Sequence, residues 1–317
     1  MSNKKHFLGM ITYFKNEGHI LYEWILHYKK WGVNHIWLID NGSEDNYNVE
    51  EFINEGFITI FKEPLLEQQS AYDKYIPKIK NEVIWVCNCD LDEFLYSKEN
   101  QDLKFILENN IGKNIDIVSI QMTIFFPCTF ETPASVIEKN VKRKCFDSDK
   151  YPKCIYNLDK LKNITIHGTN SKNKLHLTAD KTLLCINHYR YTSFEYLYGI
   201  KEGRGCNPSK SSKPIHKSKY DVTYGHKFMT LINSLDDNFL SDDTYLKNNS
   251  KDVIDKCYKK NTKPKINLYP KSSWLYLKNN LRDEYNKFSN YNNHNRLLTH
   301  NEINEINIFM NNLKKSL

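Results

Sequence analysis

The 317-residue sequence lacks the features that would place it in a membrane or mark it for export. No run approaches the roughly 18 consecutive apolar residues that a membrane-spanning helix needs. The first residues, MSNKKHFLGMITYF, are basic and then apolar but contain no small-residue cleavage site, so they predict a first strand rather than a signal peptide. No internal repeat is present. These absences predict a cytoplasmic chain without a transmembrane segment.

The eight cysteines include no Cys-x-x-Cys pair, which argues against a zinc ribbon. Their even number would permit a disulfide framework, but a secreted protein should carry an export signal. Cys87 and Cys89 lie in an apolar, strand-like run, where a reduced cysteine packs as a small apolar residue. Cysteine usage therefore agrees with the cytoplasm.

The net charge of +7 is unevenly placed in a sequence that is 40% hydrophobic and 26% charged, as in soluble globular proteins. Residues 136–230 hold 19 Lys and Arg but 8 Asp and Glu, so they carry +11 and the remainder −4. A basic segment of this kind can face phosphates, nucleic acid or anionic lipid headgroups, and peripheral membrane contact is one expectation. For most of these lysines a solvated surface is the simpler explanation.

Strands and helices alternate through the first 126 residues, which predicts an α/β fold built from βαβ units. Apolar, β-branched runs indicate buried strands, and apolar residues three or four positions apart indicate helices. The result is a mostly parallel sheet with helices on both faces. We expect strands at residues 7–14, 35–40, 57–61, 83–86 and 115–126. Helices are expected at 20–28, 49–53, 68–79 with an interruption at Pro77, and up to 110.

The pattern weakens after Pro127, where short apolar runs are separated by lysine-rich segments. We expect one main domain over residues 1–230 and a helical C-terminal extension over residues 231–317. The smaller elements predicted here are a strand at 182–186, helices at 193–201, 228–235 and 274–281, a mobile loop at 207–220, and an amphipathic helix at 303–313 that packs back on the domain.

The chain is organised around Ile84–Tyr96 (IWVCNCDLDEFLY), an apolar run that ends in Asp90, Asp92 and Glu93. Ligands of open α/β sheets bind at the carboxyl ends of the strands, where this run delivers its charges. In an extended segment Asp90 and Asp92 point to the same side while Leu91 faces the core. Two oxygen donors suit Mg²⁺ or Mn²⁺, and such an ion suits a diphosphate. Solvated acids in a surface turn are the alternative.

Several motifs accompany this one in a fixed order, and together they resemble GT-A type glycosyltransferases, closest to glycosyltransferase family 92 and its family-2-like relatives. The resemblance covers residues 7–205. It implies a Rossmann-like nucleotide-sugar-binding and catalytic domain. The motifs are Asn16-Glu17, Asp40-Asn41-Gly42-Ser43-Glu44-Asp45, Asp90-Leu91-Asp92-Glu93-Phe94, Asn187-His188-Tyr189, Ser193-x-Glu195 and Lys201 to Gly205.

The resemblance implies a nucleoside pocket after the first two strands. Asp40 or Asn41 would read the uracil edge of a UDP-sugar, and Asn16 would line the same pocket. Arg204, between two glycines, is positioned to reach a phosphate, although a plain glycine-rich loop explains it equally well. In place of the tryptophan and Gly-Ser pattern associated with family 92, this sequence has Phe126-Pro127-Cys128. The donor sugar is therefore left open.

The resemblance also implies a metal–diphosphate site. Asp92, with Asp90 nearby, would hold Mn²⁺ or Mg²⁺, and His188 would be a later ligand that closes the metal shell. A histidine after a buried strand is as often structural. Two interpretations are open for Gln68, Gln69, Tyr72 and Asp73: contact with the donor or acceptor, or simply a helix start.

An inverting transfer needs a carboxylate base to activate the acceptor hydroxyl, and the candidates are Glu93, Glu131 and Glu195. The sequence does not choose among them. Glu195 also fits a capping box at a helix start, and Glu93 also fits a supporting role behind the metal ligands.

The sequence therefore predicts a metal-dependent, hexosyltransferase-like enzyme that moves a sugar from a nucleotide donor to a hydroxyl of a glycan or glycoconjugate. One alternative is a nucleic-acid-binding protein that uses the basic residues 136–230, but the acids at residues 90–93 would repel a polyanion unless metal is bound. Another is a domain that binds sugar nucleotides without turnover.

Overall fold

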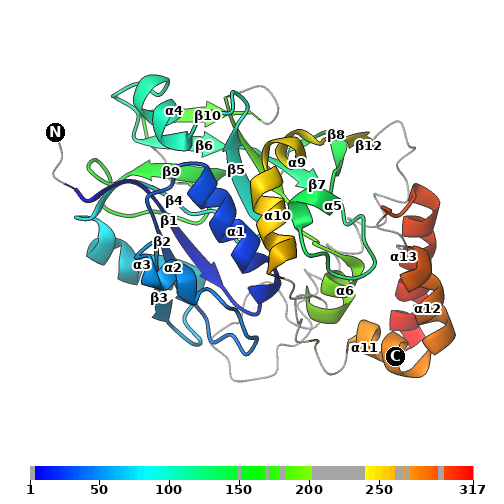
Figure 1. Cartoon of the computed structure of the whole chain (residues 1–317). Helices are drawn as coiled ribbons and strands as arrows, with labels where there is room; N and C mark the ends of the chain where they lie inside the picture. The colour runs from blue at the N-terminus through cyan, green and yellow to red at the C-terminus, as the bar shows by residue number, and fades with distance from the viewer. Residues whose placement is uncertain are drawn as a thin grey trace.

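A seven-stranded sheet forms the centre of the fold in the computed structural model, which describes residues 4–148, 151–168, 171–178, 183–201, 240–260, 268, 272–291 and 296–316 (Figure 1). The four strands β1 to β4 run parallel to one another, whereas β9 is antiparallel to both of its neighbours. The strand order is β10 (Lys174–Leu177), β6 (Ile117–Ile120), β9 (Lys153–Asn157), β4 (Val83–Cys87), β1 (His6–Phe14), β2 (His35–Asp40) and β3 (Ile58–Lys62).

Helices cover this sheet on both faces, because its central strands bury apolar side chains on both sides. Leu8 and Met10 of β1 share one core with α1 (Gly18–Lys30), α2 (Glu50–Asn54) and α4 (Leu103–Asn109). Ile11 points the other way, into a second core beneath α3 (Gln68–Ile79). The predicted α/β class, with a mostly parallel sheet between helices, is confirmed.

A second, five-stranded sheet lies beside the first and was not predicted. The expected single strand over residues 115–126 is wrong, because the chain leaves the first sheet after β6 and enters the second one as β7. Both halves of the run are apolar and buried, so the change of sheet at Gln121 leaves no mark in the hydrophobic pattern. The strand order is β12 (Leu240–Asp242), β8 (Lys142–Ser148), β7 (Met122–Phe125), β11 (Leu184–His188) and β5 (Glu93–Ser97).

Residues beyond 240 pack in two different places. Helices α9 (Tyr245–Asn249) and α10 (Lys251–Lys259) join the core around α1. Helices α11 (Ser273–Asn280), α12 (Arg282–Tyr291) and α13 (His300–Ser316) form a third core with Phe126, Phe130 and residues 191–198, at the right of Figure 1. The predicted helix at 228–235, the loop at 207–220 and the domain boundary at residue 230 lie outside the described residues. Within the described part, no helix has the length and apolar character to span a bilayer.

Helix α1 connects the two sheets through side chains that bond the backbone of the second one. Trp24 donates its indole N–H to the carbonyl oxygens of Asp90 and Glu93, each at 3.0 Å. Tyr28 donates to the Glu93 carbonyl oxygen at 2.9 Å and accepts from the amide of Leu95 at 3.0 Å. Since buried carbonyl groups need donors, these contacts fix the chain between β4 and β5.

His27 completes this set, with its Nε2 2.8 Å from the Leu95 carbonyl oxygen, and burial lowers the pKa of its imidazole to about 3. The unfolded chain protonates His27 near its ordinary pKa of about 6.5, whereas the folded chain keeps it neutral. The stabilisation is therefore fully present above that value and is lost as the pH falls toward 3.

Between pH 7 and pH 5 the free energy of unfolding should fall by about 2 kcal/mol more in the natural chain than in His27→Gln. The glutamine keeps a side-chain donor for the Leu95 carbonyl oxygen. Urea unfolding at the two pH values measures this difference. His176→Gln, at an exposed position of β10, is the matched control. Its free energy of unfolding should fall between pH 7 and pH 5 as much as that of the natural chain. Equal losses in the natural chain and His27→Gln would show that His27 does not set the acid sensitivity.

Candidate active site

The acidic cluster lies in a turn rather than in an extended segment, so the prediction that Asp90 and Asp92 share a side is wrong. The amide of Glu93 donates to the Asp90 carbonyl oxygen at 3.0 Å and closes the turn. Asp90 consequently faces Gln68 and Lys153, and Asp92 faces His188 and Lys201. The two aspartates lead into different sets of contacts.

Lys153 contacts both Asp90 and Glu93, and it is almost fully buried at the start of β9. Its ammonium lies 2.6 Å from an Asp90 carboxylate oxygen and 3.4 Å from Glu93 Oε2. Burial lowers the pKa of Lys153, but Asp90 and Glu93 together raise it well above its usual range, so it stays charged. Burial raises the pKa of Glu93 to about 8, although the positive charge of Lys153 opposes this shift. Sequence reasoning missed Lys153, whose signal is a lone lysine heading an apolar run.

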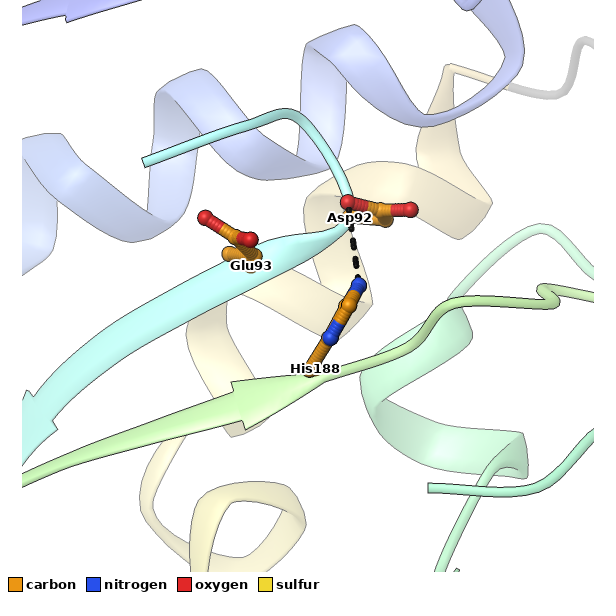
Figure 2. A group of neighbouring side chains, drawn as sticks. All are labelled: Asp92, Glu93 and His188. Carbon is orange, nitrogen blue, oxygen red and sulfur yellow. Dashed lines mark ion pairs between the residues drawn. The ribbon is translucent and has the colours of Figure 1, made fainter. Parts of the chain in front are cut away.

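Asp92 and His188 face each other across the β5–β11 pairing (Figure 2). His188 lies opposite Glu93 in this antiparallel pair, and its Nε2 is 3.6 Å from Asp92 Oδ1. Lys201 Nζ lies 2.9 Å from the other oxygen, Asp92 Oδ2. Burial alone would raise the pKa of Asp92, but Lys201 and His188 outweigh it and hold the pKa well below its usual range. Asp92 is therefore an ionised carboxylate.

The donor set around Asp92 fits a divalent cation. Asp92, Glu93 and His188 each offer one ligand atom, and these atoms lie within 4.8 Å of one another. Two carboxylate oxygens and an imidazole nitrogen suit Mn²⁺ or Mg²⁺ better than a thiophilic metal. Among the described residues, Asp90 does not belong to this group. Of the three predicted ligands, Asp92 and His188 lie together. The third member of the group is Glu93 and not Asp90.

The loops after β1 and β2, where the nucleoside pocket is predicted, are bonded to each other. The amide of Asn16 donates to Ser43 Oγ at 3.0 Å, and the Asn16 side chain accepts from the amide of Glu44 at 2.8 Å. Asn16 has a φ of 53°, a left-handed conformation that asparagine tolerates better than most residues. The side chain of Asn16 is therefore used to join the two loops.

Asp40 and Asn41 differ sharply in their partners, although both are buried. Asp40 accepts from the amide of Ser43 and the hydroxyl of Tyr47, each at 2.7 Å, and from Lys62. Burial opposes ionisation of Asp40, but these partners lower its pKa. The Asn41 amide oxygen and nitrogen, in contrast, have no hydrogen-bond partner among the described residues.

Glu131 and Glu195 lie toward the C-terminal helices. The Glu195 carboxylate accepts from the amide of Thr132 at 3.0 Å, and burial raises its pKa. The proposed capping box at Glu195 is wrong, because Ser193 is the N-cap of α6 (Phe194–Tyr196) and bonds the Tyr196 amide. Glu131 accepts from the hydroxyl of Tyr285 on α12. Arg204 lies outside the described residues.

Known proteins similar to this chain include plant sequences and bacterial structures. A glycosyltransferase family 92 protein of Ricinus communis is 26% identical over 61% of this chain and 37% of its own length. One from Oryza sativa subsp. japonica is 24% identical over 63% and 36%. The chain thus spans little more than a third of these relatives.

Among solved structures, S. aureus TarS residues 1–349 in complex with UDP-GlcNAc is 16% identical at a TM-score of 0.38, over 57% of this chain and 58% of that one. Glucosyl-3-phosphoglycerate synthase from Mycobacterium tuberculosis, in complex with Mn²⁺, UDP and glucosyl-3-phosphoglycerate, is 11% identical at 0.35, over 55% and 70%. The family model of glycosyltransferase family 92 matches residues 10–307. The chain belongs to glycosyltransferase family 92.

Lys153→Met should destabilise the fold by about 3 kcal/mol, because it leaves the carboxyl groups of Asp90 and Glu93 without their buried cation. Urea unfolding at pH 7 measures the loss. Lys74→Met removes an ammonium that pairs with Glu63 on the surface and should cost less than about 1 kcal/mol. A Lys153→Met cost no larger than this control would exclude a structural role for the buried ammonium.

Proposed function

We propose that the chain is a metal-dependent glycosyltransferase that moves a sugar from a uridine diphosphate donor to a hydroxyl of a glycan or glycoconjugate. The observation that carries the proposal is the convergence of Asp92, Glu93 and His188 where β5 begins and its partner β11 ends. Family membership supports the reaction class. A cation bound there would neutralise charge on the departing diphosphate.

The three residues contribute differently to this site. Asp92 supplies the permanent negative charge, because its pKa is held well below neutrality by Lys201 and His188 against the effect of burial. His188 is oriented by its strand pairing with Glu93. Glu93 accepts from the amide of Asp90 at 2.8 Å, and burial raises its pKa to about 8, so a cation bound there would displace its proton. Held in the turn and at the ion, Glu93 would not act as a base.

The general base is therefore better sought in Glu131 and Glu195. Glu195 is the stronger candidate of the two, since burial raises its pKa and so increases its basicity. The amide of Thr132 fixes the position of the Glu195 carboxylate. Arg204 as a phosphate ligand, Asp90 as a cofactor-binding residue, the cytoplasmic location and membrane contact through residues 136–230 stay predictions.

The function is tested with a panel of nucleotide sugars in the presence of Mn²⁺, read as release of nucleoside diphosphate. His188→Ala should lower turnover more than about tenfold, equivalent to about 1.4 kcal/mol of transition-state stabilisation, with little change in unfolding free energy. His176→Ala is the control. Unchanged turnover per folded molecule in His188→Ala would remove His188 from the site, and no turnover with any donor would leave a binding domain.

The nucleoside pocket is proposed to use Asn41 rather than Asp40. A buried amide without a partner is unfavourable, so a base edge that pairs with both atoms of Asn41 would recover that free energy. Asp40 already has three partners and is proposed to hold the loop instead. The proposal predicts preference for one base, because a purine leaves the polar groups of a uracil pocket unpaired.

UDP at a hundredfold excess over its Kd, with Mn²⁺ present, should raise the free energy of unfolding by about 2.7 kcal/mol. We expect a smaller rise for ADP and GDP at the same concentration, and a smaller rise for UDP with Asn41→Ala. Asp40→Asn should instead lower the stability of the free protein. If Asn41→Ala responded to UDP as the natural chain does, the base would be read elsewhere.

A further inference from the structure

The ammonium group of Lys201 pairs with the Asp92 carboxylate, which a bound cation would need as a ligand. Its ammonium lies 2.9 Å from Asp92 Oδ2, and His188 lies on the other oxygen at 3.6 Å. The side chain of Lys201 is only 21% exposed, and that of Asp92 11%. Asp92 is thus already neutralised by a positive charge supplied by the chain itself.

The ammonium is held in place by aromatic rings as well as by charge. Lys201 Nζ lies 5.3 Å from the ring centroid of Tyr196 and 5.6 Å from that of Tyr191, distances at which a cation is attracted to a ring face. Tyr196 is itself fixed, because its hydroxyl donates to Glu17 at 2.9 Å. Lys201 ends a π-helix, η1 (Leu197–Lys201), a rare element that often occurs at functional sites.

An ammonium and a divalent cation on one carboxylate repel each other strongly where water is largely excluded. We propose that Lys201 and the divalent cation compete for Asp92, so that the chain's own ammonium closes the metal site until the ion displaces it. The inference rests on the proposed function, because it concerns the same site. It assigns Lys201 as a positioning residue that sets metal affinity, and it leaves a released ammonium beside the incoming diphosphate.

The test uses Mn²⁺ alone, with free ion measured by its electron paramagnetic resonance signal during titration of the full chain. Lys201→Met keeps the apolar stem but removes the charge, and should bind Mn²⁺ at least about tenfold more tightly than the natural chain. Lys201→Arg restores the positive charge and should return the affinity toward the natural value. Lys74→Met, which removes a surface lysine of α3, should match the natural chain.

Two results would overturn the proposed exchange of Lys201 for the ion at Asp92. One is equal or weaker Mn²⁺ binding by Lys201→Met, and the other is Mn²⁺ binding by Lys201→Arg as tight as by Lys201→Met. Adding Asp92→Asn to Lys201→Met should abolish the gain, and a gain that survived would place the ion away from Asp92 and refute the proposal. Circular dichroism confirms that each variant is folded.

The titration needs neither nucleotide nor turnover, so its outcome is separate from that of the donor panel. Tighter binding by Lys201→Met supports the exchange even if no donor sugar is turned over. Turnover by the natural chain together with unchanged Mn²⁺ affinity in Lys201→Met would refute the exchange and leave the proposed function in place.

Discussion

The hydrogen bonds from α1 to the backbone of residues 90–95 are the contacts on which the site depends. Between β4 and β5 the chain leaves one sheet and joins the other as an edge strand, which has a neighbouring strand on one side only. Trp24, His27 and Tyr28 supply the missing donors from a helix already fixed against the first sheet. Because Asp92 and Glu93 are part of this turn, their positions are set by a buried aromatic face and not by a free loop.

Charge balance imposes the second constraint. Three carboxylates gather in a turn that is mostly shielded from water, and unpaired buried charges are costly. Two lysines from distant segments pair with these carboxyl groups: Lys153 with Asp90 and Glu93, and Lys201 with Asp92. Pairing of this kind offsets part of the cost of burying the carboxylates.

The sequence reveals the parts of this structure that follow from local patterns. The apolar runs predicted the central strands, and the order of motifs pointed to Asp92 and His188, which lie together. The bounds of α3 were predicted, but the expected interruption at Pro77 is wrong, because the helix continues through it. The second sheet was missed because β7 continues the apolar run of β6 without a break in the hydrophobic pattern. Lys153 was missed because β9 inserts between β4 and β6 from far along the chain, and no local signal reports that pairing.

The packing at Gly199 links the tail of the chain to the site. A Cβ at this position would lie 2.4 Å from a Leu268 methyl carbon and 3.7 Å from Trp274, so the absence of a side chain lets the π-helix pack closely on both residues. Two residues later that π-helix ends in Lys201. Leu268 and Trp274 thus support the element that carries the ammonium: a chain that ended after α10 would retain the acidic residues of the site but lose this packing.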